Sequence, residues 1–316
     1  LVITPSMNYF ELIIDKDQDF SISTDTIDFL KSMKIVGSDE NLQFNNYQMF
    51  MMENQKKAMK WRKTYDRTKK MADSTGLATY KDSLSLAKTE LAKLDSLVKN
   101  KWDEVITASP TSLLAAVLKS MKDINVPPSP KNELGVVTDS SFQYRYYKNH
   151  FFDNIDFKDS RLLKTPILEG KIEEYLEKVC IQIPDSLTKE VDRLYELSKS
   201  NDKMLRFMLQ FLFNKYNNPK IMGMDRMFVH ISEKYYLSGI AYWAKSDTAF
   251  LNKVKDRVVH QKQNLIGEIA PELRLFDING NVVSLHSIKA DYIVLYFFDT
   301  ECGHCQKIIP QWAKIN

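Results

Sequence analysis

The sequence predicts an α+β multidomain protein, with a short β segment at the N-terminus, a mostly α-helical middle domain and an incomplete α/β domain at the C-terminus. β-Branched and aromatic runs separated by polar turns come first, before residue 38. Apolar residues then recur at helical spacing as far as residue 264. Near the C-terminus, a Cys-x-x-Cys motif follows an apolar run. The predicted domains are therefore residues 1–37, 38–264 and 265–316.

Composition is typical of a globular protein with more than one core. The chain has 316 residues, of which 44% are hydrophobic and 27% are charged, so it is too apolar to be disordered. Its apolar runs are far shorter than the roughly 20 residues of a membrane-spanning helix. The formal net charge of +3 is small for this length and requires no anionic partner.

The N-terminal stretch has the pattern of short strands. Residues 9–14 and 20–24 are rich in aromatic and β-branched side chains, and the polar residues 15–19 separate them. Residues 33–36 form a third candidate strand before Gly37. We therefore expect β structure up to this glycine.

The middle of the chain is dominated by helical periodicity. A first long helix is marked by apolar residues from Leu42 to Tyr65, and a second by apolar residues at near-heptad spacing from Leu84 to Trp102. A third is capped by Ser109-Pro110. Consecutive prolines within residues 126–130 then interrupt the pattern. Beyond them, further helices are predicted at residues 139–149, 166–179, 185–198, 202–216, 222–236 and 247–263.

The motif Cys302-Gly303-His304-Cys305 follows the apolar run 293–298 and precedes an amphipathic segment that ends in Trp312. A cysteine at the start of a helix meets unpaired N–H groups and the positive end of the helix dipole, both of which favour the thiolate. Cys302 is therefore the predicted nucleophile, and Cys305, one turn further on, is the predicted resolving thiol. His304 would stabilise the thiolate further and make the pair more oxidising.

Two other interpretations of the cysteines remain open. The pair could be half of a structural zinc site or two inert core thiols, but the chain has no second Cys-x-x-Cys and no His pair at zinc-finger spacing. We therefore predict no metal and no cofactor. Cys180 lies in a helical pattern and is expected to be a buried free thiol, with a redox or lipid-linked role as the alternative.

A basic stretch between Lys56 and Lys70 is interleaved with Trp61 and Tyr65. Such a pattern can indicate a nucleic-acid patch. Glu53 and Asp66 lie beside it and the chain's net charge is low, so a solvated helix face is favoured and no nucleic acid is predicted as a partner.

Three stretches resemble one protein family. Residues 266–285 contain Gly-x-x-Ala-Pro followed by two apolar segments around an Asn-Gly turn, and Cys302-Gly303-His304-Cys305 comes after them. Together, residues 266–316 resemble the thioredoxin-like domain of TlpA/ResA-type thiol-disulfide oxidoreductases of Bacteroidetes. Residues 144–155 resemble an uncharacterised helical domain of these multidomain proteins, and residues 1–37 resemble the end of their small β-sandwich domain.

The resemblance implies a thiol-disulfide oxidoreductase that acts on protein disulfides in the cell envelope. It implies protein thiol or disulfide substrates, a membrane-bound redox partner and an outer-membrane protein complex. The expected location is the periplasm or the outer-membrane face, with a lipid anchor on residues that precede Leu1. Because Leu1 is not a methionine and the chain stops before the cis-proline loop of the thioredoxin fold, we expect a piece of a longer exported protein that is inactive alone. The alternative is a non-catalytic envelope lipoprotein or interaction module whose helical domain docks a partner.

Overall fold

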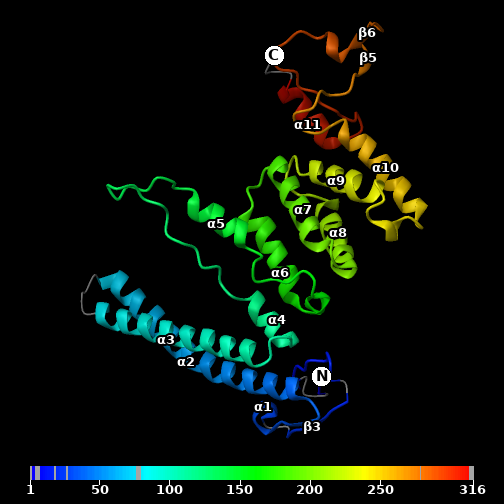
Figure 1. Ribbon diagram of the computed structural model, residues 1–316. Helices are drawn as coiled ribbons and strands as arrows, with labels where there is room; N and C mark the ends of the chain where they lie inside the picture. Colours follow the sequence, from blue (N-terminus) through cyan, green and yellow to red (C-terminus); the bar gives the residue numbers. More distant parts are fainter. Residues whose placement is uncertain are drawn as a thin grey trace. The chain divides into compact units, whose positions relative to one another are not determined.

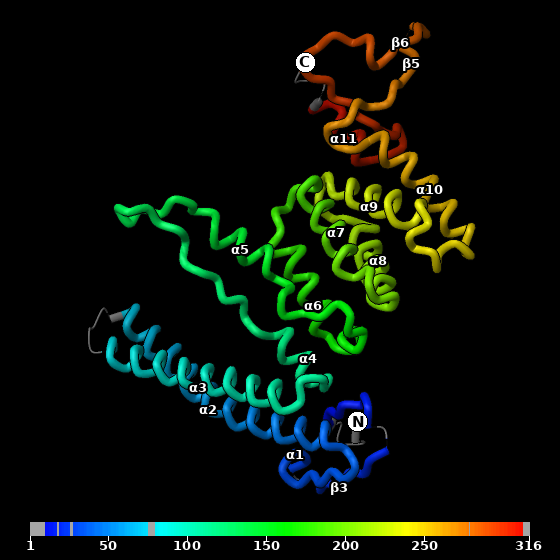
Figure 2. Tube along the Cα trace, in the orientation of Figure 1, coloured from blue at the N-terminus to red at the C-terminus, as the bar shows by residue number. Residues whose placement is uncertain are grey.

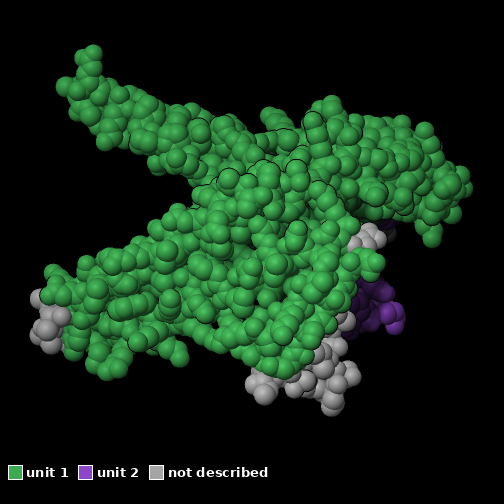
Figure 3. Space-filling view, turned by 60° about the horizontal axis from the view of Figure 1, so that its bottom comes forward, with its two compact units in different colours: residues 1–258 green, residues 259–316 purple. Residues whose placement is uncertain are grey.

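A computed structural model of the protein describes residues 2–3, 8–17, 19–25, 28–75, 80–277 and 279–312. The chain divides into two compact units, residues 1–258 and residues 259–316, which Figure 3 shows in green and purple. Leu1 and residues 313–316, to which the sequence-based domain boundaries extend, lie outside the described residues.

Unit 1 is mostly helical, as Figure 1 shows. Its helices are α1 (Phe29–Ser32), α2 (Asp39–Thr75), α3 (Tyr80–Ala108), α4 (Leu113–Ser120), α5 (Phe142–His150), α6 (Pro166–Glu174), α7 (Pro184–Ser198), α8 (Asp202–Asn217), α9 (Asp225–Ile231) and α10 (Thr248–Lys262), which crosses the unit boundary. Shorter turns lie between them: η1 (Ser160–Lys164), η2 (Tyr175–Val179), η3 (Ser232–Leu237) and η4 (Tyr242–Ala244). The helical middle region predicted from the periodicity is thus confirmed.

Helices α2 and α3 pack side by side along their length (Figure 2). The buried residues of α3 are Ala87, Leu94 and Val105, whereas those of α2 are the polar residues Asn41, Asn45, Asn54 and Thr68. Trp102 Nε1 donates a hydrogen bond of 3.2 Å to the Tyr47 hydroxyl across this interface. The end of the pair joins α4 through a small core of Val105, Leu114 and Leu118.

Helix α4 begins later than the sequence suggested. The predicted cap was Ser109-Pro110, but the residue at the N-cap is Ser112, whose hydroxyl accepts a hydrogen bond of 3.0 Å from Ala115 N–H. The same hydroxyl donates to the Ser109 carbonyl at 2.8 Å. Ser112 therefore satisfies one of the N–H groups that a helix start leaves unpaired.

Helices α7, α8 and α9 pack on one another around a mostly apolar core, which also buries Ser198. Two helices of unit 1 end in a wider, π-type turn: α6 continues into η2 and α9 into η3. In the first, Cys180 N–H donates a 2.9 Å hydrogen bond to the Tyr175 carbonyl, five residues earlier. The core side chains with no exposed area include Val191, Leu194, Met204, Met208, Leu212 and Ile231.

The strands predicted at residues 20–24 and 33–36 are confirmed, whereas most of the strand predicted at residues 9–14 is not formed. Two separate antiparallel ladders join β1 (Val2–Ile3) to β2 (Asn8–Tyr9) and β3 (Ser21–Ser23) to β4 (Lys34–Val36). Residues 10–14, predicted as part of a strand, form no strand. Instead, the Asn41 side chain accepts a hydrogen bond from Ile13 N–H at 2.8 Å and donates to the Ile13 carbonyl at 2.7 Å. The Asn41 side chain thus hydrogen-bonds to both the N–H and the C=O of Ile13, which a neighbouring strand would otherwise need for pairing.

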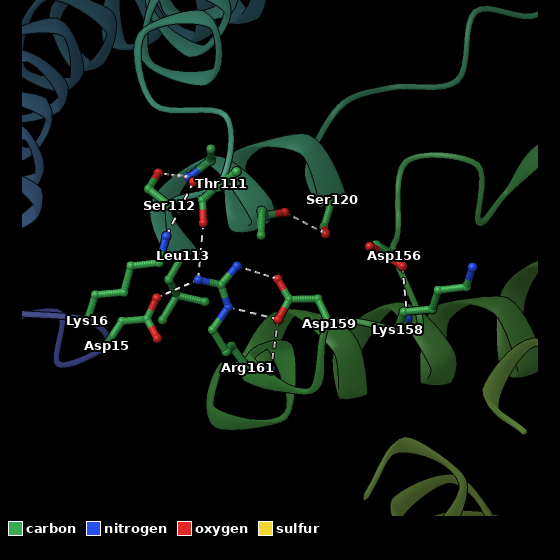
Figure 4. A network of polar contacts seen from close by, with 12 residues as sticks. Asp15, Lys16, Thr111, Ser112, Leu113, Ser120, Asp156, Lys158, Asp159 and Arg161 are labelled. Carbon is green, nitrogen blue, oxygen red and sulfur yellow. Dashed lines mark hydrogen bonds and ion pairs between the residues drawn. The ribbon is translucent and has the colours of Figure 1, made fainter. Parts of the chain in front are cut away.

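A polar network ties this N-terminal stretch to the helices of unit 1 (Figure 4). Arg161 makes two hydrogen bonds to Asp159, of 2.9 and 2.7 Å, and donates a third to the Thr111 carbonyl at 3.2 Å. The same guanidinium forms an ion pair with Asp15, which is 146 positions away in sequence. Lys16 Nζ adds a bond of 3.3 Å to the Thr111 hydroxyl.

Unit 2 contains an antiparallel ladder of β5 (Arg274–Phe276) and β6 (Val282–Ser284), the turn η5 (Leu285–Ser287) and helix α11 (Gly303–Trp312). The two strands around the Asn-Gly turn are therefore confirmed. The apolar run 293–298, predicted as the strand before the cysteines, is not a strand. An extended segment becomes a strand only through hydrogen bonds to neighbouring strands, and the described part of unit 2 pairs β5 and β6 with each other alone. Most side chains of the run are exposed, Val294 by 71% and Phe297 by 78%.

Candidate functional site

Cys302 lies at the N-terminal end of α11, immediately before Gly303. Its carbonyl accepts the hydrogen bond of 3.1 Å from Gln306 N–H, so Cys302 occupies the N-cap position of the helix. The sequence predicted this placement from the motif spacing, and the structure confirms it.

The loop that leads into the helix is held by local hydrogen bonds. Asp299 Oδ1 accepts from Glu301 N–H at 2.9 Å, and the Asp299 carbonyl accepts from Cys302 N–H at 3.2 Å. Gln306 Nε2 donates to the Thr300 carbonyl at 2.7 Å, which ties the first turn of the helix back to the loop. The backbone around Cys302 is therefore shaped by Asp299 and Gln306, which sequence reasoning did not single out.

The environment of the Cys302 sulfur favours its ionised form. The hydrogen bond from Cys305 N–H contributes most to lowering the pKa of Cys302, followed by the Cys305 thiol and by His304 N–H. The two N–H groups belong to the first helical turn, where unpaired N–H groups stabilise a negative charge. The role of Cys302 as the nucleophile stays a prediction.

Cys305 lies one turn into α11, and its neighbour from outside the helix is Tyr296. Desolvation by neighbouring atoms, and then a hydrogen bond between its hydroxyl and the Cys305 sulfur, raises the pKa of Tyr296. The Tyr296 ring also stacks on Phe298, with centroids 6.1 Å apart. Tyr296 lies in the apolar run that the sequence assigned to a strand. Nothing in the sequence therefore indicated its polar contact with the cysteine pair.

His304 is exposed and reaches Cys302 through its backbone N–H. The predicted role of its imidazole in stabilising the thiolate stays a prediction. The structure brings Cys302, His304 and Cys305 together because one helical turn joins them, which requires no long-range packing.

Both cysteines of the motif are free thiols and partly exposed. A thiol with a lowered pKa and access to solvent can attack a disulfide, and a second thiol one turn away can displace the product. The arrangement can therefore carry out thiol–disulfide exchange.

The third cysteine has the opposite environment. Cys180 is buried, with 5% of its surface exposed, and burial together with the Glu190 charge raises its pKa to about 11. The expectation of a buried free thiol is confirmed. A thiol that stays protonated and covered is a poor nucleophile at neutral pH.

Around Cys180, unit 1 holds a cluster of charged groups that sequence reasoning missed. The Tyr175 hydroxyl donates to Glu190, and Lys148 Nζ lies 2.6 Å from the other carboxylate oxygen. Arg193 donates to the Tyr175 oxygen at 2.9 Å and to the Lys148 carbonyl at 3.1 Å. Burial and the Glu190 contact raise the pKa of Tyr175. Every charge in the cluster has a partner, which is typical of a structural network.

Among the described residues, no group of three or more His, Cys, Asp and Glu side chains is arranged to hold a metal ion. Within the same part of the chain, no helix is both long and apolar enough to cross a membrane.

Comparison with known proteins places the helical region in a family. No curated protein and no solved structure matches the chain. The profile of the family described as "Domain of unknown function (DUF5106)" matches residues 82–257, which is more than half of the 316 residues. The matched range begins within α3, ends within α10 and stops before the cysteine motif. The chain therefore belongs to the DUF5106 family.

Proposed function

We propose that the protein is a thiol-disulfide oxidoreductase that acts on protein disulfides in the cell envelope. The observation that carries the proposal is the position of Cys302, whose sulfur lies at the N-terminus of α11 within reach of two backbone N–H groups. A structural thiol gains nothing from such a site, whereas a nucleophilic thiolate is stabilised there.

The proposed reaction has two steps that balance in atoms and electrons. The Cys302 thiolate attacks a substrate disulfide, forms a bond to one sulfur and releases the other as a thiolate, which takes up a proton. Cys305 then loses its proton and attacks the Cys302 sulfur, which frees the second substrate thiol. The substrate gains two electrons and the pair becomes a disulfide, which a dithiol partner must reduce before the next cycle.

The remaining parts of the proposal rest on the sequence resemblance. Residues 265–316 would belong to a thioredoxin-like domain of the TlpA/ResA type, and the protein would work in the periplasm or at the outer-membrane face. Its partners would be protein thiols and disulfides, together with a membrane-bound reductant or oxidant. The helical domain would position the substrate or dock an outer-membrane complex.

The first test is trapping of the mixed disulfide with oxidised glutathione as the probe, in the full-length protein. We expect the Cys305→Ser variant to accumulate one glutathione on Cys302, because the resolving thiol is missing. Cys302→Ser should accumulate none, and the matched control Cys180→Ser should behave as the wild type, because Cys180 is buried. Mass spectrometry measures the adduct, and equal labelling of all three variants would refute the proposal.

The pH dependence of alkylation tests the same site independently. Because its pKa is lowered, Cys302 should react with iodoacetamide with a midpoint below the roughly 8.5 of a free cysteine. Cys180, with a pKa of about 11, should stay unlabelled through neutral pH in the folded protein. A midpoint for Cys302 at or above that of a free thiol would contradict the proposed nucleophile.

A second candidate function, docking of a protein partner by the helical domain, is favoured by the loop between α4 and α5. At its tip, Leu134 is 87% exposed and Val136 is 59% exposed. The turn is nevertheless ordered by Asn132, whose side chain accepts hydrogen bonds from Leu134 N–H at 3.1 Å and Val136 N–H at 2.9 Å. An apolar tip on a fixed turn is suited to insertion into a pocket of a partner.

Two variants separate the candidates. If docking is the function, Leu134→Asp should abolish recovery of the partner complex after cross-linking in cells, while a Cys302→Ser, Cys305→Ser double variant retains it. If thiol exchange is the function, the double variant loses the glutathione reaction and Leu134→Asp keeps it. Loss of folding is checked for each variant by circular dichroism.

A further inference from the structure

We propose that the outer face of α2 is a binding surface for the headgroups of an anionic phospholipid bilayer. Five cations lie along this face, at successive steps of four, three, four and three residues: Lys56, Lys60, Lys63, Arg67 and Lys70. All five are exposed. Side chains at these steps stack on one side of a helix. We call this row the basic stripe.

The stripe faces away from the partner helix. Helical geometry places Ala58, Trp61, Tyr65 and Thr68 on the opposite side of α2, where Ala58, Trp61 and Tyr65 are half-buried and Thr68 is buried. Lys88 of α3 lies 5.9 Å from the centre of the Tyr65 ring, which places that ring at the helix pair. The stripe is therefore open along its length while the opposite side of α2 is covered.

Positive charge is in large excess around the stripe. Residues 53–70 contain eight of the chain's 44 lysine and arginine residues and two acidic residues, Glu53 and Asp66, whereas the whole chain has a net charge of only +3. None of the ion pairs recorded among the described residues involves the five stripe cations. Like charges three and four residues apart destabilise a helix. An arrangement that opposes folding and has no internal partner is explained by an external anion.

The shape of the stripe favours a flat partner. With a rise of 1.5 Å per residue, five cations over fourteen steps form a straight line of about 21 Å. A bilayer surface presents phosphates in a plane, and each lysine or arginine near it contributes to binding. Met59, beside the stripe and 51% exposed, can enter the interfacial region.

The same geometry argues against single-stranded nucleic acid. Proteins of that class stack bases on exposed aromatic rings between the cations. The aromatic residues of this stretch, Trp61 and Tyr65, lie on the covered side of α2 and are only partly exposed. The interleaved pattern seen in the sequence thus separates, in three dimensions, into a charged face and a packing face.

The test is binding of the full chain to vesicles of phosphatidylcholine with phosphatidylglycerol, compared with phosphatidylcholine alone, at about 0.1 M salt. We expect binding to the anionic vesicles alone, measured by co-sedimentation. A Lys56→Gln, Lys60→Gln, Lys63→Gln variant should bind roughly a hundredfold more weakly, from about fivefold for each charge removed. The matched control is Lys189→Gln, Lys203→Gln, Lys253→Gln, which removes three exposed lysines of α7, α8 and α10 and should keep most of the affinity.

Three results would overturn the proposal. One is equal binding to both kinds of vesicle, and another is equal weakening in the stripe and control variants, which would mean that overall charge decides. The third is tighter binding to a DNA or RNA duplex than to the anionic vesicles, lost in the stripe variant, which would assign the surface to nucleic acid. Circular dichroism verifies that each variant retains its helices.

Discussion

At the scale of single residues, Arg161 ties the N-terminal stretch to residues far along the chain. Its guanidinium contacts Asp159, Asp15 and the Thr111 carbonyl, and only 28% of its side chain is exposed (Figure 4). Asp15 and Asp159 are each 16% exposed. Charge-assisted hydrogen bonds in such a partly buried setting are stronger than those of surface pairs.

Arg161→Gln should lower the free energy of unfolding by about 2 kcal/mol at neutral pH, because two carboxylates lose their shared cation. The Arg161 contact holds the pKa of Asp159 below its usual range. A lowered folded pKa gives stability that is present above the unfolded value of about 3.9 and is lost as the pH falls through the folded value. The difference between variant and wild type should therefore shrink below about pH 4. Urea denaturation across this range measures it, with Arg161→Lys as an intermediate control.

At the scale of elements, the start of α4 shows how a helix end is fixed. The Ser112 hydroxyl accepts from Ala115 N–H and donates to the Ser109 carbonyl. In addition, Glu40 of α2 accepts a hydrogen bond of 2.8 Å from Leu113 N–H. Two of the N–H groups at this helix start are therefore satisfied by side chains, one local and one from a distant helix.

Ser112→Ala should destabilise the protein by about 1 kcal/mol, the usual cost of losing a serine N-cap. Ser112→Thr keeps a hydroxyl at the same position and should retain most of the stability. Thermal denaturation followed by circular dichroism compares the two. Equal stability of the alanine variant and the wild type would show that Glu40 alone fixes the start of α4.

At the scale of the whole molecule, the two units differ in how much apolar surface they bury. In unit 1, Leu212 of α8 has no exposed area, whereas Phe297 of unit 2 is 78% exposed. A large-to-small substitution in a packed core lowers the free energy of unfolding, because transfer free energy is lost and a cavity is left. Truncating an exposed side chain changes the free energy of unfolding little.

Leu212→Ala should therefore lower the free energy of unfolding by about 3 kcal/mol. Phe297→Ala should change it by no more than about 0.5 kcal/mol. Urea denaturation, followed by far-ultraviolet circular dichroism, gives both values. A loss above about 1 kcal/mol for Phe297→Ala would show that the apolar run 293–298 is covered in solution.

The sequence by itself determined the parts of this protein that depend on local interactions. Helical hydrogen bonds join residues four apart, so the recurrence of apolar residues in α2 and α3 and the prolines after Val126 were enough to locate helices and a break. The position of Cys302 before α11 belongs to this class, because one helical turn contains the whole motif.

Only the tertiary structure decided which distant groups pair. Ile13 bonds to the Asn41 side chain instead of to a strand, and Arg161 reaches Asp15 across 146 positions. Residues 293–298 have the composition of a strand but form none, since a strand exists only where another backbone offers hydrogen bonds. Such pairings depend on which segments the packed helices bring together, and the local pattern of residues does not predict this.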